Sequence, residues 1–551
     1  MRNTYSFDVF DTCLCRLCGE PRLLFDVLSL KVQKAMGDGC TEHLRQLFVA
    51  ARATAGGKTL EEIYNDVAQR YPLPCSVEQM VEMELETERE MLAPIVATRQ
   101  LVDSLREKGD IVFISDMYLP SAFIREQLAK HGFFKDGDRL FVSDELGAWK
   151  RDGSLYRYVK EQLGISYRHW HHYGDNRGSD YTVPRRLGIR AHYIHYDYLP
   201  YEEQWRKMPV LQYQYPAIMA GVARATRLSS DAPEDQKAFV CDISAPLMVS
   251  WVLNIMADAQ QRGIRRLYFC ARDVHTEYLI AKQLQPMFPR VEVRYLFISG
   301  PALYKCSLCL DYLNQEGLND GTPVAIVDSC TSGETLRTMN RLIRQNGGEP
   351  VHGYFLVQMS PSSNKENEPS EVAHYELQTG YLDAVASRAA RRIGGMRIMP
   401  ELIFSINFHK KTYGYEYHGR YLRPVFKDDD DDQWLFDNND VRTMKRHNDT
   451  LLSKYANSIV SAGLIPHSKP ILDFLAFPTL TDYLDCPRKE YLRYLLHFFW
   501  WNKPFVGHIS GKHKGVWKRG NLFYSLPCFI TTPLRIILGN PALRRRLNQL
   551  L

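Results

Sequence analysis

An aspartate and a threonine follow the first apolar segment of the chain at a spacing that could support nucleophilic chemistry. The residues up to Phe7 predict a short strand, Asp8 comes directly after it, and Thr12 follows four positions later. A parallel strand buried on both faces projects its last side chain into the crevice where open α/β sheets bind ligands. A carboxylate there can attack phosphorus and form an aspartyl-phosphate, which divides one difficult displacement into two easier ones. An ordinary Asx turn at the strand end explains the same residues without chemistry.

A hydroxyl and a lysine occur at comparable places further along the chain. Residues 111–114 form a second apolar run that ends in Ser115 and Asp116. Lys150 follows in the segment 149–156. A cation at that place would neutralise both a nucleophilic carboxylate and a transferring group in a preorganised site. A lone lysine is more often a solvated surface charge, so Lys150 indicates a catalytic site only together with the other motifs.

Two aspartates follow a third predicted strand. Gly174 and Asp175 come after the short stretch 170–172, and Asp180 lies five positions beyond Asp175. Hard oxygen ligands, few in number, suit Mg²⁺, which retains several waters and bridges to a substrate phosphate. The pair therefore predicts a magnesium site.

These four motifs, in this order, resemble the haloacid dehalogenase (HAD) superfamily of hydrolases. The resemblance implies that Asp8 is the nucleophile and that Ser115 holds a phosphoryl oxygen. It implies that Lys150 is catalytic and that Ser115, Asp116 and Lys150 contact the substrate. The implied ligands of Mg²⁺ are Asp8, the backbone carbonyl of Phe10, Asp175 and Asp180.

Three sequence blocks are similar to a narrower group within that superfamily. They are residues 7–12, 115–120 and 150–156. The group consists of large two-part HAD-like proteins associated with bacterial surface-polysaccharide biosynthesis. That association is implied by the resemblance alone.

One position departs from the pattern of most HAD phosphatases. These carry a second Asp two positions after the nucleophile, as general acid and base, where this chain has Phe10. Phe10 cannot transfer a proton, and Asp11 occupies the position that is usually Gly. Loss of a positioned acid or base typically costs about 10²–10⁴-fold in rate. The leaving group therefore needs little protonation, another group substitutes, or the domain hydrolyses poorly.

The elements that must position these residues form an α/β domain over residues 1–200. Strands alternate with helices to Tyr198, as a doubly wound parallel sheet requires. Residues 18–98 read as a helical insertion, in which Thr59 and Glu62 have capping-box spacing. The resemblance implies a cap that closes over the site, and a packing subdomain without a lid function is the alternative.

The remaining chain predicts a second large domain and a tail. With 551 residues, 45% of them hydrophobic, the chain can bury more than one core. We expect a linker over 201–237, a second α/β domain over 238–425, an acidic loop and helical connector over 426–486, and a C-terminal region over 487–551. The net charge of +5 gives no reason to expect nucleic acid as a partner. Twelve Cys without a disulfide pattern, and no recognisable signal peptide, predict a cytoplasmic protein.

The second domain contains a candidate anion-binding loop. Strands are predicted at 267–271, 296–299 and 324–327, and the last is followed by a loop rich in hydroxyls. The candidate binding residues are Asp328, Thr331, Ser332, Gly333 and Thr335. Free backbone N–H groups and a helix dipole would converge there. The loop resembles the ribose-phosphate loop of phosphoribosyltransferases, although the second acid is replaced by Ser329; helix capping alone is the other interpretation.

The C-terminal part changes in composition. Five consecutive Asp at 428–432 predict a solvated loop. Region 487–551 is basic and aromatic, which suits peripheral association with an anionic membrane or a glycan. A helical tail packed on the second domain explains the same composition.

Three functions are consistent with these residues. The first is a Mg²⁺-dependent hydrolase of a phosphorylated sugar or a similar small metabolite. The second is a weakly active or inactive binding or assembly protein of surface-polysaccharide synthesis, which Phe10 favours. The third is a transferase that uses the Asp328 loop of the second domain.

Overall fold

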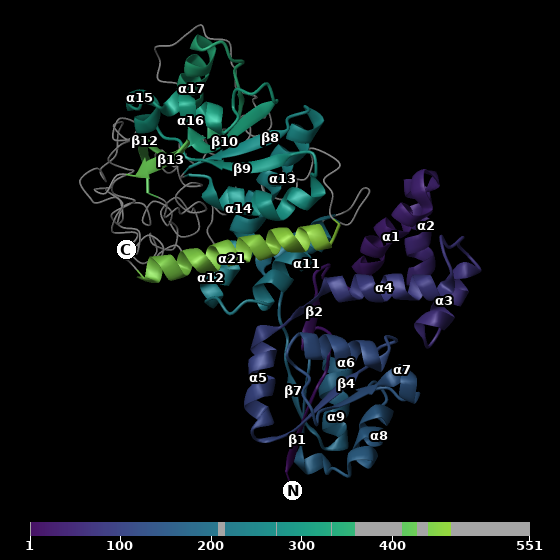
Figure 1. Ribbon diagram of the computed structural model, residues 1–551. Coiled ribbons are helices and arrows are strands. Elements are labelled where there is room, and N and C mark those ends of the chain that lie inside the picture. The colour runs from purple at the N-terminus through teal and green to yellow at the C-terminus, as the bar shows by residue number, and fades with distance from the viewer. Residues whose placement is uncertain are drawn as a thin grey trace, which may run out of the picture. The chain divides into compact units, whose positions relative to one another are not determined.

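The computed structural model describes residues 2–207, 215–271, 273–331, 333–358, 410–426 and 439–463 (Figure 1). The chain divides into two compact units. Unit 1 spans Met1–Asp231 with Ser461–Leu464, and unit 2 spans Ala232–Val460 with Ile465–Leu551. The predicted acidic run at 428–432 and region 487–551 lie outside the described residues.

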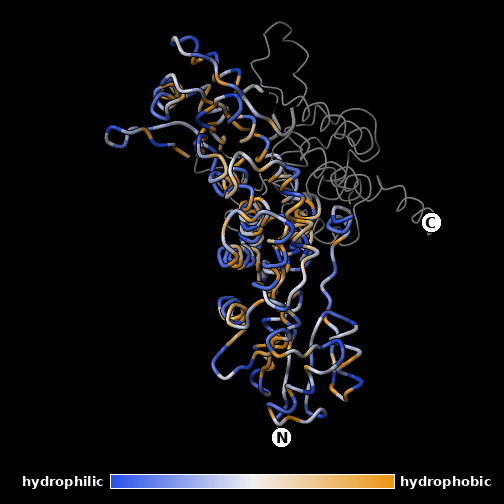
Figure 2. The backbone as a smooth tube through the Cα atoms, turned by 90° about the vertical axis from the view of Figure 1, so that its right-hand side faces the viewer, coloured by the Kyte–Doolittle hydropathy of each residue, from blue (hydrophilic) through white to orange (hydrophobic). Residues whose placement is uncertain are grey.

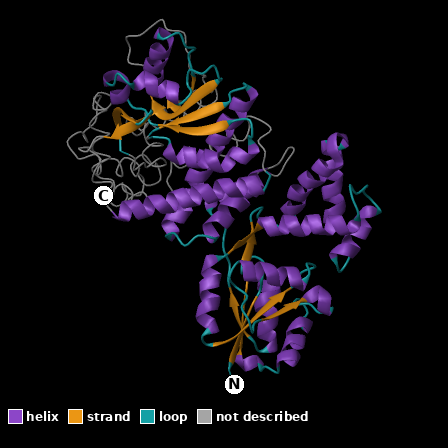
Figure 3. Cartoon of the chain, in the orientation of Figure 1, coloured by secondary structure: helices purple, strands orange, loops and turns teal. Residues whose placement is uncertain are grey.

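Unit 1 contains a five-stranded sheet in the order β5-β4-β1-β6-β7, and every neighbouring pair is parallel. Helices flank this sheet (Figure 3). The strands are β1 (Asn3–Phe7), β4 (Gly109–Ser115), β5 (Arg139–Val142), β6 (Trp170–Gly174) and β7 (Arg190–Tyr193). The helices that follow the strands are α5 (Val96–Arg106), α6 (Ser121–Lys130), α7 (Ser143–Leu146), α8 (Ser154–Leu163) and α9 (Val183–Leu187). The predicted doubly wound parallel sheet is confirmed.

The sheet is buried on both faces because successive residues of its strands point to opposite sides. Ile111 and Phe113 of β4 belong to one apolar cluster, and Val112 and Ile114 belong to another. Continuous apolar runs of this kind are typical of parallel sheets covered by helices on both sides. The helices carry apolar and polar residues side by side along their length (Figure 2), as expected when one face of a helix is buried.

The strand order reverses at β1, which has β4 on one side and β6 on the other. Ligands in open α/β sheets bind outside the carboxyl ends of the strands at such a reversal. Asp8 follows β1, Ser115 ends β4, and Asp175 follows β6. The topology therefore brings three of the predicted site residues to one edge of the sheet.

A helical insertion separates the antiparallel pair β2 (Leu14–Arg16) and β3 (Leu92–Pro94). Its α-helices are α1 (Leu23–Met36), α2 (Glu42–Ala53), α3 (Leu60–Ala68) and α4 (Val77–Met91), with the short η1 (Gly37–Gly39) after α1. The Thr59 hydroxyl accepts a hydrogen bond from the Glu62 amide at 3.2 Å, so α3 begins where its sequence predicted. We call this insertion the cap.

Two ion pairs are buried inside the cap. Arg52 of α2 donates to both carboxylate oxygens of Glu84 at 2.7 and 2.6 Å. Arg16 of β2 binds Glu88, one turn further along α4, at 2.8–3.1 Å. Removing one partner of a buried pair typically costs about 3–5 kcal/mol, because the other charge is left without compensation. These pairs therefore fix α4 against both α2 and the segment that follows the nucleophile.

Two helices occupy the stretch predicted as a linker between 201 and 237 and belong to unit 1. They are α10 (Pro200–Arg206) and α11 (Tyr215–Leu228). Arg227 of α11 binds both oxygens of Glu202 of α10 at 3.1 and 2.8 Å. The side chains of Ile218 and Val222 are completely buried. The apolar face of α11 thus packs within unit 1.

Unit 2 contains a second parallel sheet in the order β11-β10-β8-β9. Its strands are β8 (Arg266–Cys270), β9 (Glu292–Leu296), β10 (Val324–Thr331) and β11 (His352–Gln358). The helices are α12 (Glu234–Phe239), η4 (Val240–Ser244), α13 (Ala245–Gln261), α14 (His275–Leu284), η5 (Gln285–Met287), α15 (Gly300–Lys305), α16 (Cys309–Gln315), α17 (Glu334–Gln345) and α21 (Asn439–Ser461). A hairpin joins β12 (Thr412–His418) to β13 (Tyr421–Phe426).

Two of the strand boundaries expected in unit 2 were wrong. The strand predicted at 296–299 is β9, which ends at Leu296 because Ser299 instead caps α15 through the Ala302 amide at 3.3 Å. β10 continues beyond Val327 to Thr331, because it pairs with β11 along this whole length. The helical run Glu234–Gln261 is long and apolar enough to cross a membrane, but its apolar window is entirely buried in unit 2, as in the core helix of a globular domain.

Candidate active site

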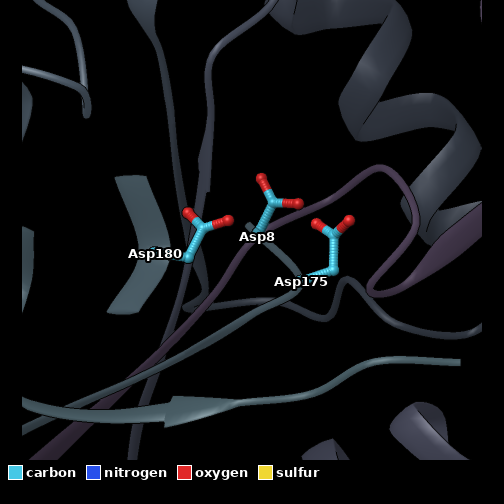
Figure 4. Close-up of side chains that lie close together, drawn as sticks. All are labelled: Asp8, Asp175 and Asp180. Atoms are coloured by element: carbon cyan, nitrogen blue, oxygen red, sulfur yellow. The ribbon is translucent and has the colours of Figure 1, made fainter. Parts of the chain in front are cut away.

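Three carboxylates converge at the carboxyl edge of the unit 1 sheet (Figure 4). Asp8 follows β1, Asp175 follows β6, and Asp180 lies in the π-helical turn Arg177–Thr182. One oxygen from each lies within 4.8 Å of the others. Gly174 makes this approach possible, because a Cβ at that position would lie 2.5 Å from the Cβ of Asp180.

The loop after β1 holds Asp8 by several hydrogen bonds. The Asp8 amide donates to the Tyr173 carbonyl at 2.9 Å, which extends the pairing of β1 with β6 by one residue. The Thr12 hydroxyl donates to Asp8 Oδ2 at 3.3 Å, and the amides of Cys13 and Leu14 both donate to the Val9 carbonyl at 2.8 and 2.9 Å. The chain therefore turns back tightly behind Asp8, and the Asp8 carboxylate lies beside those of Asp175 and Asp180.

Lys150 joins two of the three carboxylates. Its Nζ lies 2.5 Å from Asp8 Oδ1 and 2.6 Å from Asp180 Oδ1, and its side chain is only 3% exposed. The backbone amide of Lys150 donates to both oxygens of Asp116 at 3.0 and 3.1 Å. Asp116 directly follows Ser115, which is buried at the end of β4 beside β1. The structure thus brings together the side chains of Asp8, Lys150, Asp175 and Asp180, and the Lys150 backbone connects Asp116 to them.

A line of hydrogen bonds behind the site was not predicted from the sequence. Trp170 Nε1 donates to the Ser6 hydroxyl at 2.7 Å, Ser6 Oγ lies 2.7 Å from His172 Nδ1, and His172 Nε2 lies 3.3 Å from Asp180 Oδ1. Burial lowers the pKa of His172, although the contact with Asp180 opposes this, and the shift favours the neutral ring. A neutral His172 that donates from Nε2 to the Asp180 carboxylate would accept from the Ser6 hydroxyl at Nδ1. The feature of the sequence that could have indicated this line of hydrogen bonds is the presence of the polar residues Ser6 and His172 in buried strands.

The charges of this site are unbalanced. With all three carboxylates ionised, they would exceed the one ammonium group by two negative charges. Burial, together with Asp11 and Asp180, raises the pKa of Asp175 to about 6. Burial also raises the pKa of Asp8, although Lys150 opposes this. Burial acts against the charged forms of Lys150 and Asp180 as well. Attraction to Asp8 and Asp180 nevertheless raises the pKa of Lys150 above its ordinary value, and attraction to Lys150 lowers that of Asp180.

The donor set fits Mg²⁺. An excess of two negative charges is what one divalent cation balances, and carboxylate and carbonyl oxygens are the ligands that Mg²⁺ prefers. Lys150 binds Oδ1 of Asp8, whereas Oδ2 lies on the side of Thr12. The Thr12 hydroxyl also lies 3.5 Å from Asp175 Oδ1. Asp8, Asp175 and the Phe10 carbonyl would hold the ion, and Asp180 would orient the surrounding groups.

Phe10 is covered by a guanidinium group. The Cζ atom of Arg16 lies 4.5 Å from the centre of the Phe10 ring, and Glu88 of the cap binds the same guanidinium. The Phe10 ring is thus part of an aromatic and ion-pair contact with the cap.

The candidate loop of the second domain belongs to unit 2. Asp328 and Thr331 lie within β10, opposite Phe355 and Gln358, so the expected loop is shorter than predicted. Gly333 is the N-cap residue of α17 and has a φ of 78°. Ser332 lies outside the described residues, and Thr335 lies in the first turn of α17. A role of these residues in ligand binding stays a prediction.

Comparison with known proteins gives matches only among solved structures. No protein-family model and no curated protein matches the chain. YfnB of Bacillus subtilis, a protein assigned to the HAD hydrolases and solved with bound magnesium, is 18% identical over 34% of this chain and 86% of its own, with a TM-score of 0.26. A HAD phosphatase from Thermococcus onnurineus is 19% identical over 36% of this chain and 87% of its own, with a TM-score of 0.26. The L-2-haloacid dehalogenase PA0810 is 17% identical over 36% of this chain and 86% of its own, with a TM-score of 0.26. At this level of likeness, function has to follow from the geometry of the site.

We predict that Mg²⁺ raises the melting temperature of the protein. At a concentration 100-fold above its Kd, an ion that binds only the folded state stabilises it by about 2.7 kcal/mol. Asp175→Asn should remove most of this shift in differential scanning fluorimetry. Asp136→Asn, at an exposed residue that precedes β5 on the opposite edge of the sheet, should retain it. Equal shifts in both variants, or none in the natural protein, would contradict a metal site at these carboxylates.

Proposed function

We propose that unit 1 is a HAD-type, Mg²⁺-dependent hydrolase that transfers a phosphoryl group to Asp8. The observation that carries this proposal is Lys150, which binds Asp8 and Asp180 through one buried ammonium group, while Asp175 lies alongside. Three separate segments of the chain contribute these residues: one follows β1, one follows α7, and one follows β6. An ordinary surface ion pair would not require residues from several segments to meet at one buried ammonium group.

In the proposed reaction, a carboxylate oxygen of Asp8 attacks phosphorus and the bond from phosphorus to the leaving oxygen breaks. Ser115 and Lys150 hold the phosphoryl oxygens and stabilise their negative charge in a site that the fold has already organised. Water then attacks phosphorus, the bond to Asp8 breaks, and inorganic phosphate and the free carboxylate result. When bound, Mg²⁺ would stabilise the charge on the transferring group.

Phe10 restricts the substrates that this reaction can use. The leaving oxygen departs with its electron pair, and Phe10 supplies no proton to it. Three of the described charged residues near Asp8 already have ion-pair partners, since Lys150 and Asp180 bind each other and Asp11 binds Arg224. We therefore assign none of these three as the acid that protonates the leaving oxygen. We therefore propose small phosphorylated metabolites whose leaving group is weakly basic, such as an acyl phosphate or the anomeric phosphate of a sugar.

We propose that the cap limits the size of the substrate. It is joined to the nucleophile loop through Glu88 and Arg16, and to the segment after Ser115 through the Tyr118 hydroxyl, which lies 3.4 Å from Glu84. A cap attached at both places can exclude water from the crevice and choose the substrate.

Phe10 also favours a second candidate, a binding or assembly protein with little turnover. In that case the site would bind a phosphorylated ligand and the surface-polysaccharide association of the resembling proteins would describe its role. Cytoplasmic location and peripheral contact of region 487–551 with an anionic membrane or glycan belong to the same proposal.

We predict that Asp8→Asn abolishes phosphate release. The full-length protein, with Mg²⁺ and a panel of acyl phosphates, sugar phosphates and nucleotides, should release phosphate from at least one compound. Loss of the nucleophile should lower the rate on the order of 10⁴-fold or more. Asp136→Asn serves as the matched control and should remain active. Absence of turnover with every compound would favour the binding protein, and turnover that survives Asp8→Asn would contradict the assigned nucleophile.

We further predict that Phe10→Asp changes the range of leaving groups. An acid at this position should raise the turnover of alkyl phosphates by about 10²-fold relative to acetyl phosphate, because only the basic leaving group needs a proton. Phe10→Leu should leave that ratio unchanged. The ratio of kcat/KM values for glucose 6-phosphate and acetyl phosphate measures the effect. A natural protein that hydrolyses both compounds equally well would contradict the role assigned to Phe10.

A further inference from the structure

Asp11 holds an unusual backbone conformation in the loop that carries the nucleophile. Its φ is 55°, and it is the one non-glycine residue with a positive φ in the part of the chain that the structure describes. The conformation is fixed from both sides, since the Asp11 amide donates to the Leu14 carbonyl at 2.7 Å and the Leu14 amide donates to Val9. Residues other than glycine adopt this region at a cost, although Asp tolerates it better than most.

The Asp11 side chain is held by a residue from outside the sheet and the cap. Arg224 of α11 donates through Nη1 to Asp11 Oδ1 at 2.9 Å, across a sequence separation of 213 residues. Arg224 is 6% exposed and is itself fixed, because its Nε donates to the Tyr196 carbonyl at 3.1 Å and its guanidinium lies 5.0 Å from the centre of the Tyr198 ring. Both partners of the ion pair are therefore held in one arrangement.

The backbone of α11 approaches the same segment closely. A Cβ at Gly221 would lie 2.2 Å from the Gly19 amide nitrogen and 2.6 Å from the Gly19 Cα, so no side chain fits there. Gly221 and Arg224 are three residues apart and share one face of the helix. This face thus contacts the chain at two places, just after β2 and in the turn behind the nucleophile.

The conformation at Asp11 determines how its neighbours are presented. Phe10, on one side, offers the carbonyl assigned to the metal, and Thr12, on the other, donates its hydroxyl to Asp8 Oδ2. A change in the backbone at Asp11 would rotate both groups away from the site. We propose that Arg224 is a positioning residue, which holds the nucleophile loop in its working conformation through Asp11. This proposal rests on the proposed function only where it concerns Mg²⁺ binding and turnover. The effect of Arg224 on the loop conformation does not depend on that function.

An ordinary structural ion pair would have a different signature. It would contribute to the melting temperature without a specific effect on the loop or on Mg²⁺. Glycine provides the test that separates the two cases, because it adopts a positive φ without strain and needs no anchor. In an Asp11→Gly background, the loss of Arg224 should therefore matter little.

The experiment compares Arg224→Met, Arg224→Lys, Asp11→Gly and the double variant Asp11→Gly/Arg224→Met in the full-length protein. The first readout is amide hydrogen exchange of Cys13 and Leu14, whose amides both bind Val9 in the structure. The second is the apparent Kd for Mg²⁺ from the shift in melting temperature. Neither readout needs turnover, so the result stands even if no phosphoester is hydrolysed.

We expect Arg224→Met to increase the exchange rate of both amides by about tenfold and to weaken Mg²⁺ binding by a similar factor. Arg224→Lys should recover part of this loss. The double variant should match Asp11→Gly within about threefold, because the two residues act as one unit. The proposal is overturned if Arg224→Met lowers only the melting temperature, or if its effect is the same in both backgrounds.

Discussion

The buried contact of Lys150 with Asp8 and Asp180 is the interaction on which the arrangement of unit 1 depends. Carboxylates at the ends of neighbouring strands repel one another, and burial makes that repulsion costly. One ammonium group between two of them reduces this cost and leaves the charge that a divalent cation can balance. The same contact fixes the direction of the Asp8 carboxylate, which has to face the crevice to act as a nucleophile.

The elements around the sheet serve this contact in different ways. Asp116 binds the Lys150 amide and thereby connects the end of β4 to the lysine, while His172 supports Asp180 from behind. The cap reaches the nucleophile loop through Arg16 and Glu88. On the same loop, α11 reaches Asp11 through Arg224. The loop is short and carries one residue at positive φ, so support from outside the sheet explains how it keeps a single conformation.

The sequence was sufficient to predict the site residues that follow strands. It was not sufficient to predict the residues that hold them in place. Asp8 and Asp175 were singled out because apolar runs predict strands, and strand ends in a parallel sheet meet at one edge. Lys150, which follows α7, and Asp180 were singled out by the resemblance of their segments to HAD motifs. Arg224 was missed because a contact across 213 residues leaves no local pattern, and α11 lay in a stretch that looked like a linker. β10 proved longer than expected because pairing with β11, rather than the composition of residues 328–331, determines where it ends. Local patterns thus predict elements, whereas tertiary contacts decide their limits and their supports.

If Asp8 is the nucleophile, it becomes phosphorylated during turnover, and chemical trapping of the acyl phosphate can detect this. The full-length protein is mixed with Mg²⁺ and acetyl phosphate, quenched in acid during turnover, reduced with borohydride and analysed by peptide mass spectrometry. Borohydride converts an aspartyl-phosphate to homoserine and leaves a free aspartate unchanged. We expect homoserine at residue 8, and no homoserine there when Mg²⁺ is omitted. Phosphate release with an unmodified Asp8, or reduction at a different aspartate, would contradict it.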